Sequence, residues 1–211
     1  MPKLKPATQR ARREHILDAA EVCFAHSGFH RTTMQDICKE ALISPGALYV
    51  YFASKEDLIA GMAERDRAEF AERFAELSAA PDFMKALSSL GERYLVEEPV
   101  CKDTLGIEIG LESMRNPKVG AIYRSVDRFV RESFEKLFRR LAQEGRIAPD
   151  LDIPMVANLF SIIADGMGMR RATDPDFDTR TVMPAVMGLI DKLLNPQPAP
   201  AEDEKLKEPR R

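Results

Sequence analysis

Three helix-start signals fall within 22 residues near the N-terminus, and they constrain the fold of this chain more than any other feature. Each signal pairs a hydroxyl side chain that accepts a hydrogen bond from helix N–H groups with a residue suited to the first helical turn. The three pairs are Thr33 with Asp36, Ser44 with Pro45, and Ser54 with Asp57. They predict a short helix, a tight turn, a second short helix and the start of a third. That layout is a helix-turn-helix, whose second helix typically enters the major groove of DNA.

The rest of the sequence also predicts helices, because apolar residues recur at helical spacing along most of it. The predicted helices are 8–27, 33–41, a short helix from Ser44, 55–77, one between Pro81 and Pro99, 102–115, 117–144, 153–171 and 179–194. No strand pattern and no internal repeat is found. The expected fold class is therefore all-α, with about nine helices.

Charge is unevenly distributed along the chain. The net charge is −3, yet the first thirteen residues contain five Lys or Arg residues and no acid. A basic end on an acidic body fits a protein that contacts DNA through one end. A solvated basic tail is the plainer interpretation, and both can hold.

Several classes of protein are disfavoured. No apolar run approaches the roughly 20 residues that cross a bilayer, and no apolar stretch follows the basic N-terminus as in a secretory signal, so we expect a cytoplasmic protein. The three cysteines form no CxxC pair; we expect free thiols, with Cys23 and Cys38 in the core. No HExxH or GxSxG motif is present. We therefore expect no enzyme activity, no metal and no cofactor.

Residues 28–58 resemble the DNA-binding domain of the TetR/AcrR family of bacterial regulators. The matching residues are Gly28-Phe29, Thr32-Thr33-Met34, Asp36-Ile37, Ala41 to Tyr49, Tyr51-Phe52 and Ser54 to Leu58. Two residues depart from the family pattern: Leu42, where glycine is usual, and Cys38, where alanine is common. A side chain on Leu42 would be strained if the turn needs a positive φ there.

The resemblance implies that the helix from Ser44 lies in the major groove and that Tyr49 and Tyr51 meet phosphates. Thr33 and Lys55 lie at helix N-termini, which favour phosphate, and Arg31 is a weaker candidate for the same role. The alternative is that the tyrosines only pack the small domain. The predicted DNA-binding residues are Arg31, Thr33, Ser44, Pro45, Gly46, Ala47, Tyr49, Tyr51 and Lys55.

The resemblance also implies a C-terminal domain that binds a small effector and forms a dimer. Predicted helices 153–171 and 179–194 are apolar on more than one face, which indicates a second packing partner. The predicted ligand-binding residues are Met62, Phe83, Leu87, Tyr94, Leu105, Glu108, Ile109, Glu112, Tyr123, Phe160, Ile163 and Met167, with Phe70, Met84 and Met114 as further candidates. The predicted dimer residues are Leu159, Ile162, Val186, Ile190 and Leu193. Either glutamate, if buried, would favour a cationic or hydrogen-bonding ligand.

We therefore expect four parts: a disordered basic arm (1–9), a helix-turn-helix DNA-binding domain (10–58), a ligand-binding and dimerisation domain (59–194) and a disordered tail (195–211). A long helix should join the three-helix head to the body. The expected function is a homodimeric transcriptional repressor that a small hydrophobic or aromatic effector releases from a palindromic double-stranded DNA operator. The alternative is a DNA-binding regulator that senses a protein partner or acts without a small ligand.

Overall fold

The computed structural model describes residues 6–198, which form nine α-helices and one π-helix and contain no strand. The elements are α1 (Pro6–Ser27), α2 (Met34–Glu40), α3 (Pro45–Tyr49), α4 (Lys55–Ala79), α5 (Phe83–Glu92), the π-helix η1 (Arg93–Glu97), α6 (Val100–Ser113), α7 (Pro117–Gln143), α8 (Ile153–Thr173) and α9 (Thr179–Leu194). The all-α expectation is confirmed. No helix within this region is long and apolar enough to span a membrane.

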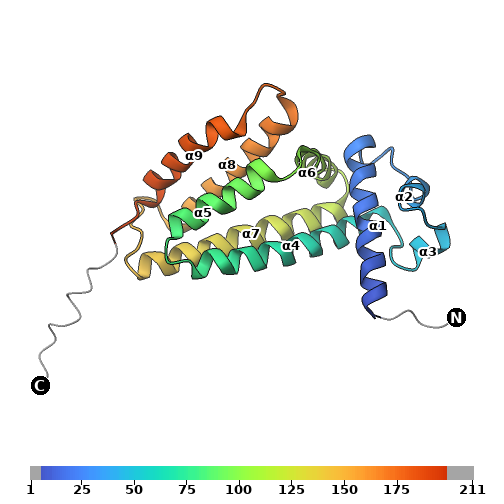
Figure 1. Ribbon diagram of the computed structural model, residues 1–211, viewed down its shortest axis with the longest axis horizontal. Coiled ribbons are helices and arrows are strands. Elements are labelled where there is room, and N and C mark those ends of the chain that lie inside the picture. The colour runs from blue at the N-terminus through green and yellow to red at the C-terminus, as the bar shows by residue number, and fades with distance from the viewer. Residues whose placement is uncertain (1–5, 199–211) are drawn as a thin grey trace, which may run out of the picture.

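Helices α1, α2 and α3 form a small head at one end of the molecule (Figure 1). The first two predicted helix starts are the N-caps of α2 and α3. The Thr33 hydroxyl accepts a hydrogen bond from the Asp36 N–H, and the Ser44 hydroxyl accepts one from the Ala47 N–H. Ser54 caps α4 in the same way. These caps satisfy helix N–H groups that have no partner within the helix.

Helix α4 leaves the head and runs along α7 into the body (Figure 1). There α5 packs on α4, α8 packs on α7, and α9 packs on α5 and α8. Helix α4 has 25 residues, which corresponds to a length of roughly 40 Å. Helix α6 lies between head and body and packs against α1 as well as α7 and α8. The head is therefore joined to the body by two routes, the continuous helix α4 and the contact of α6 with α1.

The interior consists of two hydrophobic clusters. The head cluster surrounds Phe24, Ile37 and Leu48, and it also includes Leu105 from α6 and Val119 from α7. The body cluster surrounds Phe138 and Leu194. Because two body helices complete the head core, a movement of α6 or α7 also changes the packing of the head.

The ends of the described region differ from the predicted arm and tail. Residues 6–9 are helical, because Pro6 suits a first helical turn and no helix breaker follows it. Residues 195–198 are held against the loop after α7, where the Gln197 N–H donates to the Arg146 carbonyl at 2.9 Å. The remaining predicted arm (1–5) and tail (199–211) lie outside the described residues.

The helix predicted between Pro81 and Pro99 changes character before it ends. After Glu92 the backbone widens into η1, where the Glu98 N–H donates to the Arg93 carbonyl five residues earlier at 3.0 Å. Turns of π-helix are rare in proteins, and those that do occur often lie at functional sites.

Candidate DNA-binding surface and effector site

The turn between α2 and α3 is closed by two backbone hydrogen bonds. The Leu42 N–H donates to the Lys39 carbonyl at 3.2 Å, and the Ile43 N–H donates to the Cys38 carbonyl at 3.0 Å. Leu42 adopts φ +53°, and its side chain is 90% exposed. The turn therefore requires a positive φ at this position. Leu42 adopts this unfavourable backbone conformation, and its exposed side chain makes little packing contact that could compensate for the cost.

The N-terminal half of α3 presents small side chains to solvent. Ser44, Pro45 and Gly46 are exposed, and Ala47 is half-buried. Nothing lies within 4 Å of a Cβ placed on Gly46. Another molecule can therefore approach this backbone closely, as a helix in the major groove must.

The two predicted tyrosines have different surroundings. Tyr49 is 55% exposed, whereas Tyr51 is half-buried and packs against the head cluster. Phe52 is buried in that cluster. The Tyr49 side chain is thus accessible to a DNA phosphate, whereas part of the Tyr51 side chain packs in the core of the head.

Lys55, expected at a phosphate, is instead bonded within the head. Its Nζ donates to the carbonyl oxygens of Phe29 and Thr32, the latter at 2.9 Å, and lies 4.2 Å from the centre of the Phe29 ring. Burial lowers the pKa of Lys55. The Lys55 side chain lies over the loop after α1, where the carbonyl groups of Phe29 and Thr32 have no partner within a helix. The N–H groups of its ammonium are therefore directed toward the loop and away from solvent.

Thr33 and Arg31 are exposed, but both have partners within the head. The Thr33 hydroxyl donates to the Asp36 carboxylate at 2.6 Å, and its N–H donates to the same carboxylate at 3.0 Å. These bonds lower the pKa of Asp36, so a carboxylate already occupies the start of α2. Arg31 Nε donates to the Ser27 carbonyl at 2.9 Å.

Glu108 and Glu112, expected in a ligand pocket, face the head instead. Glu112 is 5% exposed, and its carboxylate lies 2.8 Å from Nε2 of His30. Glu108 is half-buried and accepts from the Phe29 N–H at 3.3 Å. Both side chains lie there because α6 packs across α1, so these glutamates join body to head.

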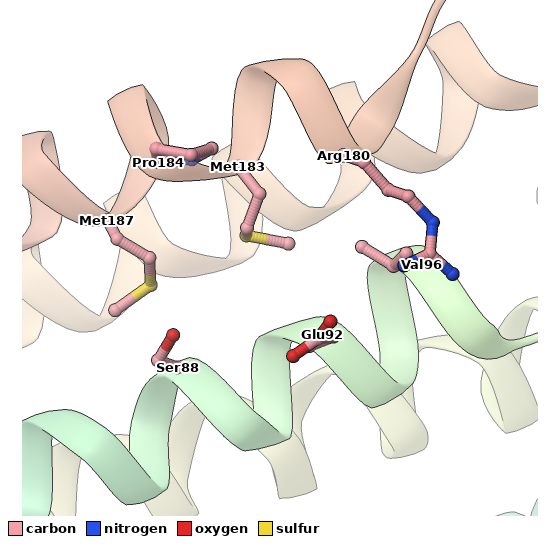
Figure 2. Close-up of a pocket in the computed structure, with 7 residues that line it drawn as sticks. All are labelled: Ser88, Glu92, Val96, Arg180, Met183, Pro184 and Met187. Atoms are coloured by element: carbon pink, nitrogen blue, oxygen red, sulfur yellow. The ribbon is translucent and has the colours of Figure 1, made fainter.

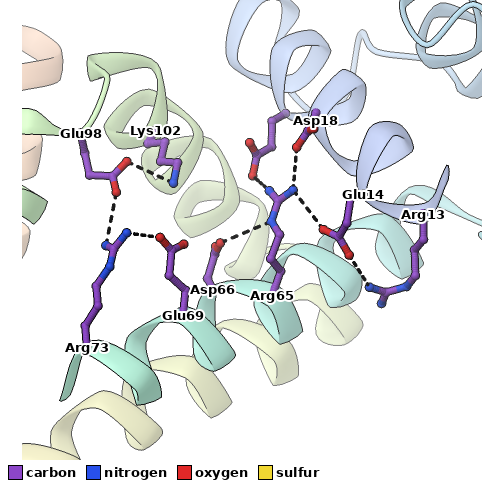
Figure 3. A network of polar contacts seen from close by, with 10 residues as sticks. Arg13, Glu14, Asp18, Arg65, Asp66, Glu69, Arg73, Glu98 and Lys102 are labelled. Carbon is purple, nitrogen blue, oxygen red and sulfur yellow. Dashed lines mark hydrogen bonds and ion pairs between the residues drawn. The ribbon is translucent and has the colours of Figure 1, made fainter. Parts of the chain in front are cut away.

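Two groups of ion pairs lie beside this joint, one between α1 and α4 and one that reaches from α4 to α6 (Figure 3). Arg65 of α4 reaches Asp18 at 2.8 Å and also contacts Glu21 of α1. Burial raises the pKa of Glu21, although the Arg65 charge opposes this. Farther along α4, Arg73 contacts Glu69 and Glu98, and Glu98 pairs with Lys102 of α6 at 3.1 Å.

The apolar residues predicted to line one pocket are divided among three places. Met62, Leu105 and Ile109 belong to the head cluster or pack against it. Phe83, Leu87 and Phe160 lie in the body cluster. The remaining four lie in the body: Tyr94 and Ile163 are half-buried, Tyr123 is 39% exposed and Met167 is buried.

One groove was missed by the sequence reasoning. It lies between α5–η1 and α9, where Met183 and Met187 point toward the helix that carries Ser88 and Glu92 (Figure 2). Val96, Arg180 and Pro184 complete its lining. The only sequence signal was the apolar character of 179–194 on several faces.

The predicted dimer residues are also unequal. Ile162 is 63% exposed, whereas Ile190 is 7% exposed and packs in the body cluster. Leu159, Val186 and Leu193 are half-buried. Three further apolar residues of the same two helices are exposed: Met155, Met169 and Leu189.

Comparisons with known proteins agree with this architecture. Residues 16–62 match the family model "Bacterial regulatory proteins, tetR family", and residues 103–195 match "BetI-type transcriptional repressor, C-terminal". The HTH-type transcriptional regulator UidR of Escherichia coli K12 is 34% identical over 72% of this chain and 80% of its own length.

Solved structures share the whole fold. Salmonella enterica GusR has a TM-score of 0.74 at 29% identity, covering 88% of this chain and 96% of that one. FadR of Bacillus subtilis in complex with stearoyl-CoA has a TM-score of 0.72 at 20% identity, covering 84% and 96%. With its helix-turn-helix head, its helical body and a relative of this similarity, the chain belongs to the TetR family of DNA-binding bacterial transcriptional regulators.

Proposed function

We propose that this protein is a repressor that binds a palindromic operator as a homodimer and releases it when a small, mainly apolar molecule binds the body. The observation that carries the proposal is the exposed, small-residue face at the start of α3, held on a rigid head that the body helices complete. The resemblance of residues 103–195 to the C-terminal part of a transcriptional repressor favours repression over activation. Such a regulator would work in the cytoplasm, where bacterial DNA lies, and the proposal needs no catalytic step.

In this proposal α3 reads DNA with few direct base contacts. Bidentate recognition of a base needs Arg, Lys, Asn, Gln or an acid, and the exposed part of α3 offers Ser44, Pro45 and Gly46 instead. Selectivity would then come from apolar contact with thymine methyl groups, from Ser44 and from DNA shape. Tyr49 would hold a phosphate, with Arg31 and Thr33 as weaker contacts and Tyr51 and Lys55 supporting the head.

The dimer interface would lie on α8 and α9. Met155, Ile162, Met169 and Leu189 leave apolar surface exposed on these helices, and burying such surface stabilises association. Two heads joined in this way can occupy one operator only when their separation matches about one turn of DNA, roughly 34 Å.

The effector signal would reach the head through α6 and α4. The contacts of Glu112 with His30 and of Glu108 with Phe29 tie α6 to the loop that precedes α2. An effector that binds one arrangement of α6 more tightly than another would shift the separation of the heads. The fold of FadR from B. subtilis, solved with stearoyl-CoA, supports a body of this kind as a small-molecule binder.

The test is a fluorescence-anisotropy titration on the DNA upstream of the protein's own gene, repeated with a panel of hydrophobic and aromatic compounds. We expect salt-sensitive binding, release by at least one compound, and about ten-fold weaker binding for Tyr49→Ala, with the dimer intact by size exclusion. Leu151→Ala, at an exposed position between α7 and α8, is the control and should bind DNA as the wild type does. The absence of specific binding to any operator-length duplex would contradict the proposal; binding that no compound releases would instead favour a protein partner.

A further inference from the structure

Arg67 lies on the face of α4 that packs against α7. One of its terminal nitrogens donates to the Ser125 hydroxyl, which is neutral and itself donates to the Ile122 carbonyl at 2.6 Å. Its Nε is buried and has no hydrogen-bond partner. Among residues 6–198, no carboxylate lies within 4.0 Å of its guanidinium.

The other arginines of similar burial are all paired with a carboxylate. Within the described region, six arginines besides Arg67 are half-buried, and each lies within 4.0 Å of an acidic side chain: Arg13, Arg65, Arg73, Arg131, Arg146 and Arg171. A buried guanidinium without a counter-charge is destabilising, and arginine is rarely buried unpaired. Among the half-buried arginines of residues 6–198, Arg67 is therefore the one whose positive charge is not neutralised by a carboxylate.

One aromatic ring lies beside this charge and belongs to a larger aromatic cluster. The Arg67 guanidinium carbon lies 5.9 Å from the centre of the Phe129 ring, which lies 5.9 Å from that of Phe70. The Phe70 ring in turn lies 5.3 Å from Phe74 and 6.2 Å from Tyr94, which η1 carries. All four rings keep some exposure to solvent, so an apolar molecule would find aromatic surface beside the charge.

The neighbouring arginine is not an equivalent site. Arg73 stacks on Tyr94 at 4.9 Å, but Glu69 and Glu98 already neutralise it. Of these two arginines, Arg67 is therefore the one that combines an unneutralised charge with a partly exposed ring.

We propose that the effector is an organic acid, whose carboxylate, sulfonate or phosphate binds the Arg67 guanidinium while its aromatic or aliphatic part lies against Phe70 and Phe129. The inference rests on the proposed effector-binding function and specifies its chemical class. An anionic acceptor forms a short, charge-assisted hydrogen bond with the unused Nε donor, and Ser125 holds the guanidinium in place for it. The interaction is stronger than at an exposed arginine because part of the guanidinium is already buried.

The test uses two fluorescent dyes that differ in one charged group. 1-Anilinonaphthalene-8-sulfonate carries a sulfonate, and N-phenyl-1-naphthylamine has the same aromatic skeleton without it. Each is titrated into the full-length dimer of the wild type, Arg67→Gln, Arg67→Lys and Arg128→Gln. Arg128 is an exposed arginine of α7 and serves as the matched control.

We expect Arg67→Gln to weaken sulfonate binding by about ten-fold or more, and Arg67→Lys to recover part of it. The neutral dye should bind all four proteins within about two-fold, and Arg128→Gln should leave both dyes unaffected. Equal losses for the two dyes would make Arg67 a merely structural residue. Unchanged sulfonate binding in Arg67→Gln, or no binding of either dye to the wild type, would overturn the inference.

A second measurement separates a binding role from a structural one. Arg67→Met should melt at the wild-type temperature or above it, because it removes an unpaired buried charge; a marked fall would oppose the inference. Operator affinity is measured on the same variants without dye. If the variants bind the operator normally but Arg67 does not distinguish the sulfonate dye from the neutral one, only the proposed effector class is refuted. If the protein does not bind the operator, the proposed function is refuted, and the dye measurements still test the site at Arg67.

Discussion

Replacing Leu42 by glycine should stabilise the protein, although it deletes a large apolar side chain. At φ +53° the Leu42 Cβ crowds its own backbone, which costs about 1–2 kcal/mol for an L-residue. The side chain is 90% exposed, so its removal forfeits almost no burial. Glycine adds conformational freedom to the unfolded chain, which costs about 0.5–1 kcal/mol. The net gain should be about 0.5–1 kcal/mol.

That gain corresponds to a rise of about 1–4 °C in the melting temperature of a chain of this size. The assay is thermal unfolding followed by circular dichroism, with urea unfolding as a second measure. Leu42→Ala is the matched control, because alanine keeps the Cβ and therefore the backbone strain; its stability should stay within about 0.5 kcal/mol of the wild type. If Leu42→Ala stabilises the protein as much as Leu42→Gly does, the gain comes from removing an exposed leucine side chain and not from relieving the positive φ. A loss of stability in Leu42→Gly would refute the strain argument outright.

Two further predictions concern packing and buried charge. Gly61→Ala should destabilise by about 1–3 kcal/mol, because its Cβ would lie 2.9 Å from the Phe52 ring. Gly106→Ala, whose new Cβ would have no neighbour within 4 Å, should stabilise the protein by about 1 kcal/mol through helix propensity. Equal changes in melting temperature for the two glycine variants would contradict the packing argument. Arg171→Met should destabilise by about 3 kcal/mol or more at pH 7, because it leaves the Asp103 carboxylate without its partner at 3.0 Å. Burial raises the pKa of Asp103, so the folded state binds this proton more tightly than the unfolded chain. The loss should therefore shrink as the pH falls through that pKa, and urea titrations that show no such trend would exclude the mechanism.

The helix-turn-helix could be predicted because its signals act over short distances. Thr33 with Asp36 and Ser44 with Ala47 form hydrogen bonds three residues apart, so the residue types at those positions are sufficient to place the helix starts. The positive φ at Leu42 belongs to the same class, since it follows from the geometry of one turn. Such features need no knowledge of what packs against them.

The roles of charged side chains could not be predicted in the same way. Lys55 stands at a helix start, yet its partners Phe29 and Thr32 lie 26 and 23 residues away. The spacing of Glu108 and Glu112 correctly placed them on neighbouring turns of one helix. Their contact with the loop after α1 depends on how α6 crosses α1, and no local pattern encodes that crossing.

The sequence by itself determined the helices, the DNA-reading motif and the family, because capping, periodicity and turn geometry are local properties. Only the tertiary structure decided which charges are satisfied and which apolar residues stay exposed. Arg67 belongs to a run of alternating charges, Glu64 to Arg67, and nothing in that run distinguishes it from Arg65. Packing brings carboxylates of α1 to Arg65 and the Phe129 ring of α7 to Arg67. The free energy of a charge depends on its solvation and on distant neighbours, and both are set when the helices assemble.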